Sequence, residues 1–511
     1  MKKVSRNIFG DPIIVSIALL SVLVHLCIIN NLEYHRDELL YFSLGMHPAA
    51  GYASVPPLIG WIAWIMQHIF GYSVFAVRLF PALLGGGLII LVSALTREMG
   101  GSRYAAVLSA VGLMISIFFQ RTFFLFMPVH IEIFIWTLII FLVVKYVNTK
   151  NADLLIFIGA VSGLALLNKY LAAIFLMGLL LIIPFTQYRN IFKEKKFLVG
   201  LACGFVVFLP NLIWQIYRGL PVINHMSELY DKQLVHMDAS LFLTEQLIMP
   251  FAGSLFTIAG LIFILGSSKM RKFRFLGYVS LFVITGLMLL KGKSYYTLGV
   301  FPFLIGTGAV AWEHWISKRW MRITFPVILI LLSVPVIPIG IPVFSTPGLI
   351  NYFKVQEDKY GIDLGRRFED GSIHSLPQDY ADMLGWEELT AITDKAYRMV
   401  KDKNACFIYA ENYGQAGAIT VIGKKYGLPE AICFNESFQY WIPLKSNPDI
   451  TSLIYINDES GDDIKDLFSK ITMVGSISNP HAREYGTAVY LCEEPKSSFN
   501  EFWKKRIASE D

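Results

Sequence analysis

Two adjacent carboxylates, Asp37 and Glu38, are the residues of this sequence best placed for acid–base chemistry. They end the segment Glu33–Glu38, directly after the first long apolar run, Ile13–Ile29. Where a membrane span meets water, a carboxylate pair can accept a proton or hold a cation beside a membrane-bound substrate. The competing interpretation is a solvated loop whose charges carry out no chemistry.

Other ionisable residues lie inside apolar runs or at their ends. Glu132 lies about one helical turn inside such a run, where a charge needs a partner or a cavity. Lys169 and Lys293 occupy tight turns between apolar runs, and Arg121 ends another run. Lysines at such places can simply extend to the membrane surface. As a set, however, the carboxylates suit proton transfer and the cations suit neutralisation of a leaving phosphate.

The sequence argues against several other kinds of site. It contains no HExxH metalloprotease motif, no Ser/His/Asp signature and no regular arginine series. The segment Gly417–Lys425 fails the phosphate-loop pattern, because five residues separate its glycines and no Ser or Thr follows the lysine. The net charge of +5 is spread over short loops, so there is no basic stripe for a nucleic acid.

The composition indicates a polytopic α-helical membrane protein. The 511 residues are 55% hydrophobic and 16% charged, with a mean hydropathy of +0.53, whereas soluble domains carry about 25% charged residues. A membrane span needs roughly 17–25 residues. Eleven apolar runs are predicted to cross the membrane, at residues 12–30, 79–97, 104–120, 128–147, 153–168, 170–187, 197–215, 247–266, 275–290, 295–312 and 322–343.

The basic loops predict an orientation in the membrane. With eleven spans, the loops rich in Lys and Arg fall on the same side as Lys2, Lys3 and Arg6, and that side is expected to be cytoplasmic. The loop 31–78 and the C-terminal tail then face outward. The Trp-rich segment Val55–Phe70 is interpreted as an interfacial helix, because a full span there would move the basic loops outside.

The sequence predicts two domains. Residues 1–345 form a transmembrane domain with the first outer loop 31–78, and residues 346–511 form an outward-facing α/β domain. In the tail, buried strands are predicted at Ala405–Ala410, Ala431–Phe434, Leu453–Ile456 and Ala488–Cys492. Helices are predicted between them at Tyr413–Tyr426 and Asp462–Ser469. The cysteines have no metal-ligand spacing, and the spacing leaves open whether a disulfide forms among Cys406, Cys433 and Cys492.

Several motifs resemble those of one protein family. The segment Tyr34–Phe42, followed by Pro56–Leu58 and Arg78–Ala82, resembles the first outer loop and second span of bacterial glycosyltransferase family 39. This family includes relatives of the protein O-mannosyltransferases and of the lipid A aminoarabinose transferase, and it has the GT-C membrane fold. Supporting matches are Gly163–Tyr170, Pro210–Gln215, Lys293–Tyr296 with Pro302, and, in the tail, Asn412–Ala418 with Leu428 and Pro429.

This resemblance implies an enzyme of the bacterial inner membrane with its active site outside the cytoplasm. Such enzymes move a sugar from a polyprenyl-phosphate carrier to a lipid, glycan or protein acceptor, and one direct displacement would invert the anomeric centre. Asp37 matches the first-loop carboxylate that serves as the base or as an essential acceptor-site group. Glu38 completes the acidic pair, and Glu132 lies where relatives often have an aspartate.

The resemblance also implies roles for the remaining site residues. Lys169 and Lys293 match positions suited to the carrier phosphate, with Arg121 and Tyr295 as further candidates. The acceptor side is expected to be lined by the residues before the acidic pair, Tyr34, His35 and Arg36. Some relatives use a divalent cation, and acidic residues alone leave open whether Asp37 and Glu38 bind one.

A transporter of lipid-linked sugars is the alternative from another functional class, with the same charges lining a translocation path. Two observations argue against it. The charges cluster at one membrane face rather than at mid-bilayer, and no inverted repeat is evident. A scaffold role is a weaker third possibility.

Overall fold

The computed structural model describes residues 10–232, 234–361, 363, 365–368, 371–443, 449–459, 461–496 and 498–508. The N-terminal residues Lys2, Lys3 and Arg6 of the predicted orientation lie outside this part of the chain. The chain divides into two compact units. The helical unit comprises residues 1–28, 49–59 and 78–341, and the loop–tail unit comprises residues 29–48, 60–77 and 342–511. The loop 31–78, predicted to belong with the first domain, is therefore shared between the units.

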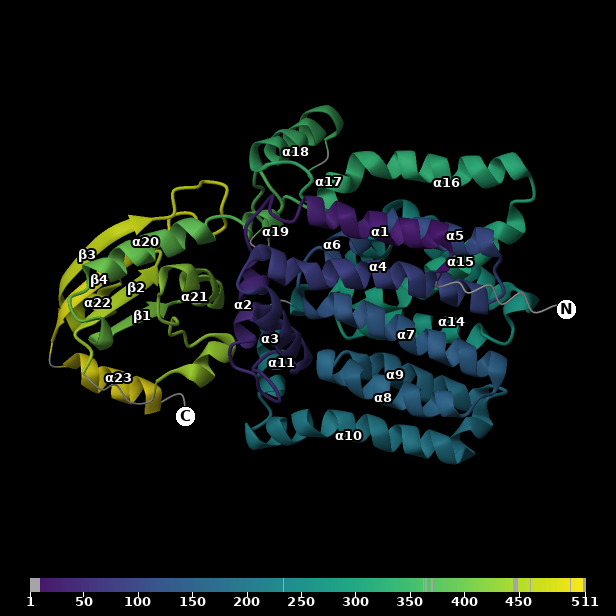
Figure 1. Cartoon of the computed structure of the whole chain (residues 1–511), viewed down its shortest axis with the longest axis horizontal. Helices are drawn as coiled ribbons and strands as arrows, with labels where there is room; N and C mark the ends of the chain where they lie inside the picture. The colour runs from purple at the N-terminus through teal and green to yellow at the C-terminus, as the bar shows by residue number, and fades with distance from the viewer. Residues whose placement is uncertain are drawn as a thin grey trace. The chain divides into compact units, whose positions relative to one another are not determined.

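The helical unit consists of apolar helices whose long members run along a common direction (Figure 1). Its helices are α1 (Pro12–Cys27), α4 (Val74–Glu98), α5 (Arg103–Met114), α6 (Ile117–Thr122), α7 (Pro128–Thr149), α8 (Asp153–Asn168), α9 (Ala172–Ile182), α10 (Lys195–Tyr217), α11 (Pro221–Lys232), α12 (Ala239–Ile248), α13 (Ser254–Gly266), α14 (Arg274–Leu289), α15 (Phe301–Trp315), α16 (Arg319–Ser333) and α17 (Ile337–Gly340). A short 3₁₀ helix, η7 (Ser294–Val300), leads into α15.

The predicted class of a helical membrane protein is confirmed. Five helical segments among the described residues are long and apolar enough to cross a bilayer, and a sixth results if α12 and α13, bent by 94°, count as one. Shorter apolar helices, such as α1 and α8, occupy other predicted spans. The total of eleven spans stays a prediction. The segment Val55–Phe70 is helical over α3 (Leu58–Phe70), and its interfacial location likewise stays a prediction.

Glycine pairs bring α8 and α10 into backbone contact. Gly159 and Gly163 of α8 face Gly200 and Gly204 of α10, each pair at a spacing of four residues. A Cβ atom on Gly159 would lie 1.9 Å from the carbonyl oxygen of Gly200. In lipid, where no hydrophobic force draws helices together, small residues allow the close van der Waals packing that holds them. These glycines therefore fix the position of the turn that follows α8.

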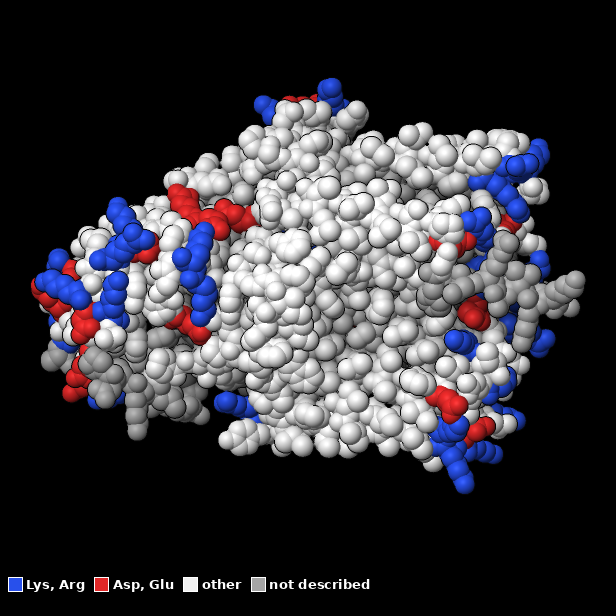
Figure 2. All heavy atoms as spheres, in the orientation of Figure 1, with Lys and Arg blue, Asp and Glu red and all other residues white. Residues whose placement is uncertain are grey.

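Charged side chains are distributed unevenly over the helical unit. Figure 2 shows a broad uncharged surface on this face of the unit, with Lys and Arg gathered at the end where α16 begins. An uncharged belt bounded by basic residues is typical of a body that crosses a bilayer. The prediction that this end faces the cytoplasm stays a prediction.

The loop–tail unit contains a four-stranded sheet with the order β1-β2-β4-β3. β1 pairs with β2 in parallel, whereas β2 with β4 and β3 with β4 are antiparallel. Its elements are α2 (Arg36–Leu44), α3, α18 (Thr346–Tyr360), α19 (Gln378–Ala381), α20 (Trp386–Met399), β1 (Cys406–Ala410), α21 (Tyr413–Val421), β2 (Ser452–Asn457), α22 (Asp462–Leu467), β3 (Phe468–Ser476), β4 (Ala488–Pro495) and α23 (Ser498–Ala508).

One strand of this sheet differs from the sequence prediction. The predicted helix Asp462–Ser469 ends at Leu467, and β3 follows immediately. β3 is the edge strand, with polar and partly exposed residues, so it lacks the buried apolar run that marks β2. The predicted strand Ala431–Phe434 contributes a single bridge, from Ile432 to Tyr409.

The cysteines of the loop–tail unit are buried thiols. Cys406, Cys433 and Cys492 are all free. Burial raises the pKa of each of these thiols to about 12, so they remain protonated and pack as small apolar groups.

Candidate active site

The acidic pair lies at the first turn of α2, and its two carboxylates have different hydrogen-bond partners. His35 is the N-cap residue, and its Nδ1 accepts a hydrogen bond from the Asp37 backbone N–H at 3.0 Å. The Glu38 carboxylate accepts one from the His35 N–H at 2.9 Å, which completes a capping box. Glu38 is fully buried. It therefore stabilises the start of the helix, and Asp37 is the member of the pair that remains accessible.

Asp37 is half-buried and held through one oxygen. The Tyr413 hydroxyl, at the start of α21, donates a hydrogen bond to Asp37 Oδ1 at 2.8 Å. The Arg36 guanidinium lies over the Tyr413 ring at 4.4 Å from its centroid. Among the described residues, Asp37 Oδ2 has no hydrogen-bond partner. The carboxylate is thus oriented and still has a free oxygen that can accept a proton.

The segment before α2 is anchored to the start of α20. The Glu33 carboxylate accepts hydrogen bonds from the backbone N–H groups of Gly385 and Glu387 at 3.4 and 2.9 Å. Burial raises the pKa of Glu33, against the lowering effect of these hydrogen bonds. The Arg36 N–H donates to the carbonyl of Asp382 at 3.1 Å. Tyr34, predicted to line the acceptor side, is buried here.

His35, Asp379 and Asp382 form a cluster that resembles a metal site. Their potential ligand atoms lie within 4.8 Å of one another, and His35 Nε2 is 3.9 Å from Asp379 Oδ1. However, His35 Nδ1 accepts the Asp37 N–H, so the proton of the neutral ring is on Nε2. A cation on Nε2 would require an imidazolate or loss of the helix cap. The cluster is better described as a ring N–H facing two carboxylates, one of which, Asp382, also pairs with Arg483 at 3.1 Å.

Glu132 and Lys169, predicted separately, form one ion pair in the helical unit. Lys169 Nζ lies 3.2 Å from Glu132 Oε2, and the two side chains are 22% and 2% exposed. The same ammonium lies 4.3 Å from the Tyr296 ring centroid and 5.3 Å from that of Tyr295. Lys169 therefore does not simply extend into the interface. It is held by a counter-ion and by the negative faces of two aromatic rings.

Two sets of hydrogen bonds that sequence reasoning missed support the turn carrying Lys169. Asn168 Nδ2 donates to the Pro128 carbonyl at 2.9 Å, at the start of α7. The Tyr170 hydroxyl donates to Asn211 Oδ1 and accepts from Gln215 Nε2, both at 2.8 Å. Apart from Pro128, these residues belong to the motifs Gly163–Tyr170 and Pro210–Gln215, so those motifs hold the Lys169 turn in place.

The other predicted cations differ in their surroundings. Lys293 is the N-cap residue of η7 and is half-buried, and none of the described residues forms an ion pair or hydrogen bond with its side chain. Arg121 is half-buried in the last turn of α6. Behind Lys293, Ser294 donates to the Glu245 carboxylate, and Gln246 Nε2 donates to the Ser294 carbonyl at 3.3 Å. Glu245 and Gln246 were not predicted as site residues.

The predicted residues thus fall into two groups, one in each unit. Tyr34, His35, Arg36, Asp37 and Glu38 belong to the loop–tail unit. The helical unit holds Arg121, Glu132, Lys169, Lys293 and Tyr295. Within the helical unit, Lys169 contacts Glu132 and Tyr295. That Arg121 and Lys293 join them, and that both groups serve a single reaction, is a proposal.

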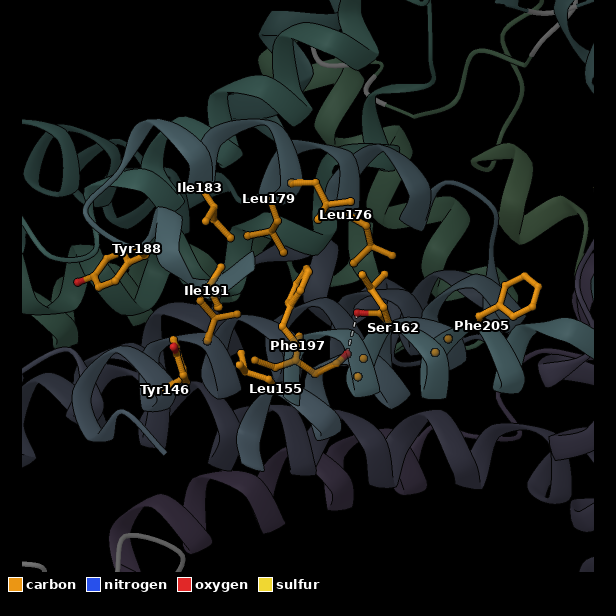
Figure 3. Close-up of a pocket in the computed structure, with 18 of the residues that line it drawn as sticks. Tyr146, Leu155, Ser162, Leu176, Leu179, Ile183, Tyr188, Ile191, Phe197 and Phe205 are labelled. Carbon is orange, nitrogen blue, oxygen red and sulfur yellow. Dashed lines mark hydrogen bonds between the residues drawn. The ribbon is translucent and has the colours of Figure 1, made fainter. Parts of the chain in front are cut away.

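The helical unit also contains an apolar cavity. Its volume is about 300 Å³, and helices α7, α8, α9 and α10 contribute to its walls. Figure 3 shows Leu155, Leu179 and Phe197 pointing into it, whereas the Ser162 hydroxyl donates to the Ile158 carbonyl of its own helix at 2.7 Å. Such walls suit a hydrocarbon chain rather than a sugar or a phosphate.

Comparison with known proteins gives four concordant matches, one of them to a solved structure. Residues 54–214 match the family described as dolichyl-phosphate-mannose-protein mannosyltransferase. The lipopolysaccharide core galacturonosyltransferase RgtA and the lipid A galacturonosyltransferase RgtD, both of Rhizobium johnstonii, are 21% and 23% identical over 38% and 39% of this chain. The chain aligns with about two-fifths of the length of these relatives, 39% and 41%.

The crystal structure of ArnT from Cupriavidus metallidurans bound to undecaprenyl phosphate is similar over nearly the whole chain. The TM-score is 0.60 at 12% identity, covering 93% of this chain and 97% of that one. The resemblance to glycosyltransferase family 39 is confirmed. Within this GT-C fold, the family match spans Arg121, Glu132 and Lys169 but not Asp37 or Lys293.

Proposed function

We propose that this GT-C protein transfers a sugar from a polyprenyl-phosphate donor to an acceptor on the outer face of the bacterial inner membrane. The observation that carries the proposal is the Asp37 carboxylate, which has one oxygen bound by the Tyr413 hydroxyl and the other without a hydrogen-bond partner among the described residues. Glycosyl transfer is supported by the family match and by the named relatives, which are sugar transferases. The acceptor is a lipid, a glycan or a protein.

In the proposed reaction, Asp37 is the general base. Its Oδ2 accepts the proton of an acceptor hydroxyl or amine while the acceptor atom forms a bond to C1 of the sugar. The bond between C1 and the phosphate oxygen breaks, and its electron pair stays on the departing polyprenyl phosphate. This single displacement inverts the anomeric centre. Of the three residues predicted to line the acceptor side, half-buried Arg36 is proposed to border it, whereas Tyr34 and His35 are buried and support the start of α2.

The cations of the helical unit are proposed to bind the phosphate. Lys169 and Lys293, with Arg121 and Tyr295, would neutralise the charge that develops on the leaving group. Glu132 was predicted as a catalytic carboxylate, and its pairing with Lys169 favours the role of a counter-ion that fixes the ammonium.

The proposed mechanism does not require a divalent cation on the acidic pair. The Glu38 carboxylate is buried and bound to the His35 N–H, so it is committed to the helix cap.

The test uses radiolabelled undecaprenyl-phosphate mannose and undecaprenyl-phosphate galacturonic acid with membrane vesicles that contain the protein. An enzyme moves the label to an acceptor, whereas a transporter only moves the labelled carrier across the membrane. Asp37→Asn should lower the transfer rate about 10²–10⁴-fold, the usual loss for a general base. Asp358→Asn, at an exposed position of α18, is the matched control. Near-normal turnover in Asp37→Asn would show that the base is another residue.

The proposed sidedness has its own test. A cysteine introduced at the exposed position Lys403 should react with an impermeant maleimide from outside intact cells, and one at exposed Lys195 should not. Outside labelling at position 195 would reverse the orientation.

A further inference from the structure

We propose that Tyr413 is a positioning residue for the catalytic base, so that helix α21 of the tail holds α2 in its working orientation. This inference rests on the proposed role of Asp37. The residues concerned, on α2 and α21, all belong to the loop–tail unit.

Tyr413 engages both residues at the start of α2. Its hydroxyl donates to Asp37 Oδ1 at 2.8 Å, and its ring lies under the Arg36 guanidinium at 4.4 Å. With Oδ1 occupied, Oδ2 is the oxygen left for the acceptor proton. The hydroxyl thereby selects which oxygen reacts and restricts rotation of the carboxylate. A phenylalanine would keep the contact with Arg36 and lose this function.

The backbone that carries Tyr413 is rigidly held. Asn412, shortly after the end of β1, is the N-cap of α21, and its Oδ1 accepts from the N–H groups of Gly414 and Gln415 at 2.9 and 3.1 Å. Gln415 Nε2 in turn donates to the Glu484 carboxylate at 2.8 Å. A capped helix start beside a strand end leaves the tyrosine little freedom, as positioning requires.

Two glycines let α2 approach α21 closely. A Cβ atom on Gly414 would lie 2.8 Å from Arg36 Cγ, and one on Gly417 would lie 2.8 Å from Leu39 Cβ. The positions are one helical turn apart, so they form one face of α21. This face gives a physical reason for the motif Asn412–Ala418, which contains the cap, the tyrosine and both glycines.

The surroundings keep the tyrosine as a proton donor. Burial raises the pKa of the Tyr413 hydroxyl, and the negative charge of Asp37 acts in the same direction, while Arg36 opposes both. The hydroxyl therefore remains protonated beside the carboxylate and does not compete with it as a base.

The test is Tyr413→Phe, assayed with undecaprenyl-phosphate mannose and undecaprenyl-phosphate galacturonic acid. We expect kcat to fall about tenfold, the usual effect of losing a hydrogen bond to a charged group, with the KM for the donor changed less than twofold. Tyr490→Phe, on β4, removes a hydroxyl elsewhere in the same unit and should leave both constants unchanged. Unchanged kcat in Tyr413→Phe, with Asp37→Asn inactive, would overturn only the positioning role. Normal turnover in Asp37→Asn would instead show that Asp37 is not the base.

A second readout needs no sugar donor. A water-soluble carbodiimide with glycine ethyl ester amidates accessible carboxylates, and mass spectrometry gives the rate at Asp37. The rate should rise severalfold in Tyr413→Phe and stay unchanged in Tyr490→Phe. If Asp37 is modified equally fast in all three proteins, the Tyr413 hydroxyl does not hold the carboxylate and the inference is wrong.

Discussion

The start of α2 and the turn after α8 hold their functional groups by opposite means. Asp37 is held by neutral groups, a tyrosine hydroxyl and a helix start, and it keeps an oxygen without a partner among the described residues. Lys169 is held by a full opposite charge, Glu132, and by two aromatic rings. A carboxylate held by one neutral donor keeps its other oxygen available to a proton. An ammonium surrounded by an anion and rings keeps its charge in a region that would otherwise penalise it.

This difference fits two distinct tasks. A base must be ready to accept a proton before the reaction begins, so its free oxygen matters more than its charge balance. A phosphate-binding cation must remain charged near lipid while no phosphate is bound. A permanent counter-ion keeps it charged, but it also weakens the attraction between the cation and the phosphate.

The largest expected effect concerns stability at the Lys169 turn. Lys169→Met leaves the Glu132 carboxylate, 2% exposed, without its ion-pair partner. Such a loss destabilises a protein by about 3–5 kcal/mol. Glu132→Gln should cost less, because the Lys169 side chain is 22% exposed and can reach water. Thermal unfolding in detergent micelles measures both variants.

The double variant Glu132→Gln with Lys169→Met is the control for this comparison. It removes both charges and should recover part of the stability lost in Lys169→Met alone. If the two single variants melt alike and the double variant is the least stable, the pair is not coupled, and Lys169 is held by the tyrosine rings instead.

The sequence indicated which residues carry charge at a membrane boundary, but not how they pair. Asp37 and Lys169 stand out because each interrupts apolar sequence. The capping role of Glu38 was missed because histidine is not among the residues usually expected at an N-cap. Tyr413 lies 376 residues from Asp37, so only the tertiary fold brings them together. The Glu132–Lys169 pair likewise depends on how α7 packs against α8, which apolar periodicity does not specify.

The second prediction tests the phosphate role of a cation with no counter-ion among the described residues. Lys293→Ala should raise the KM for the lipid-linked sugar, because a charge-assisted hydrogen bond contributes about 1.5–3 kcal/mol, or roughly 10- to 150-fold. Lys293→Arg should recover part of this, since the charge returns with a different geometry. Lys291→Gln removes a neighbouring charge and serves as control. An unchanged KM in Lys293→Ala would leave Lys169 or Arg121 as the phosphate ligands.

The smallest expected effect separates the two members of the acidic pair. Glu38→Ala removes the side chain that accepts the His35 N–H, and loss of a helix cap costs about 1 kcal/mol. Amide hydrogens at the start of α2 should then exchange about fivefold faster, with only a modest loss of transfer activity. Asp37→Asn should show the reverse pattern, with normal exchange and almost no transfer, because the side chain of Asp37 is proposed to accept the proton and has no part in the cap. If Glu38→Ala abolishes transfer while the amide hydrogens of α2 exchange at the normal rate, Glu38 is the base. The proposed roles of Asp37 and Glu38 would then be reversed.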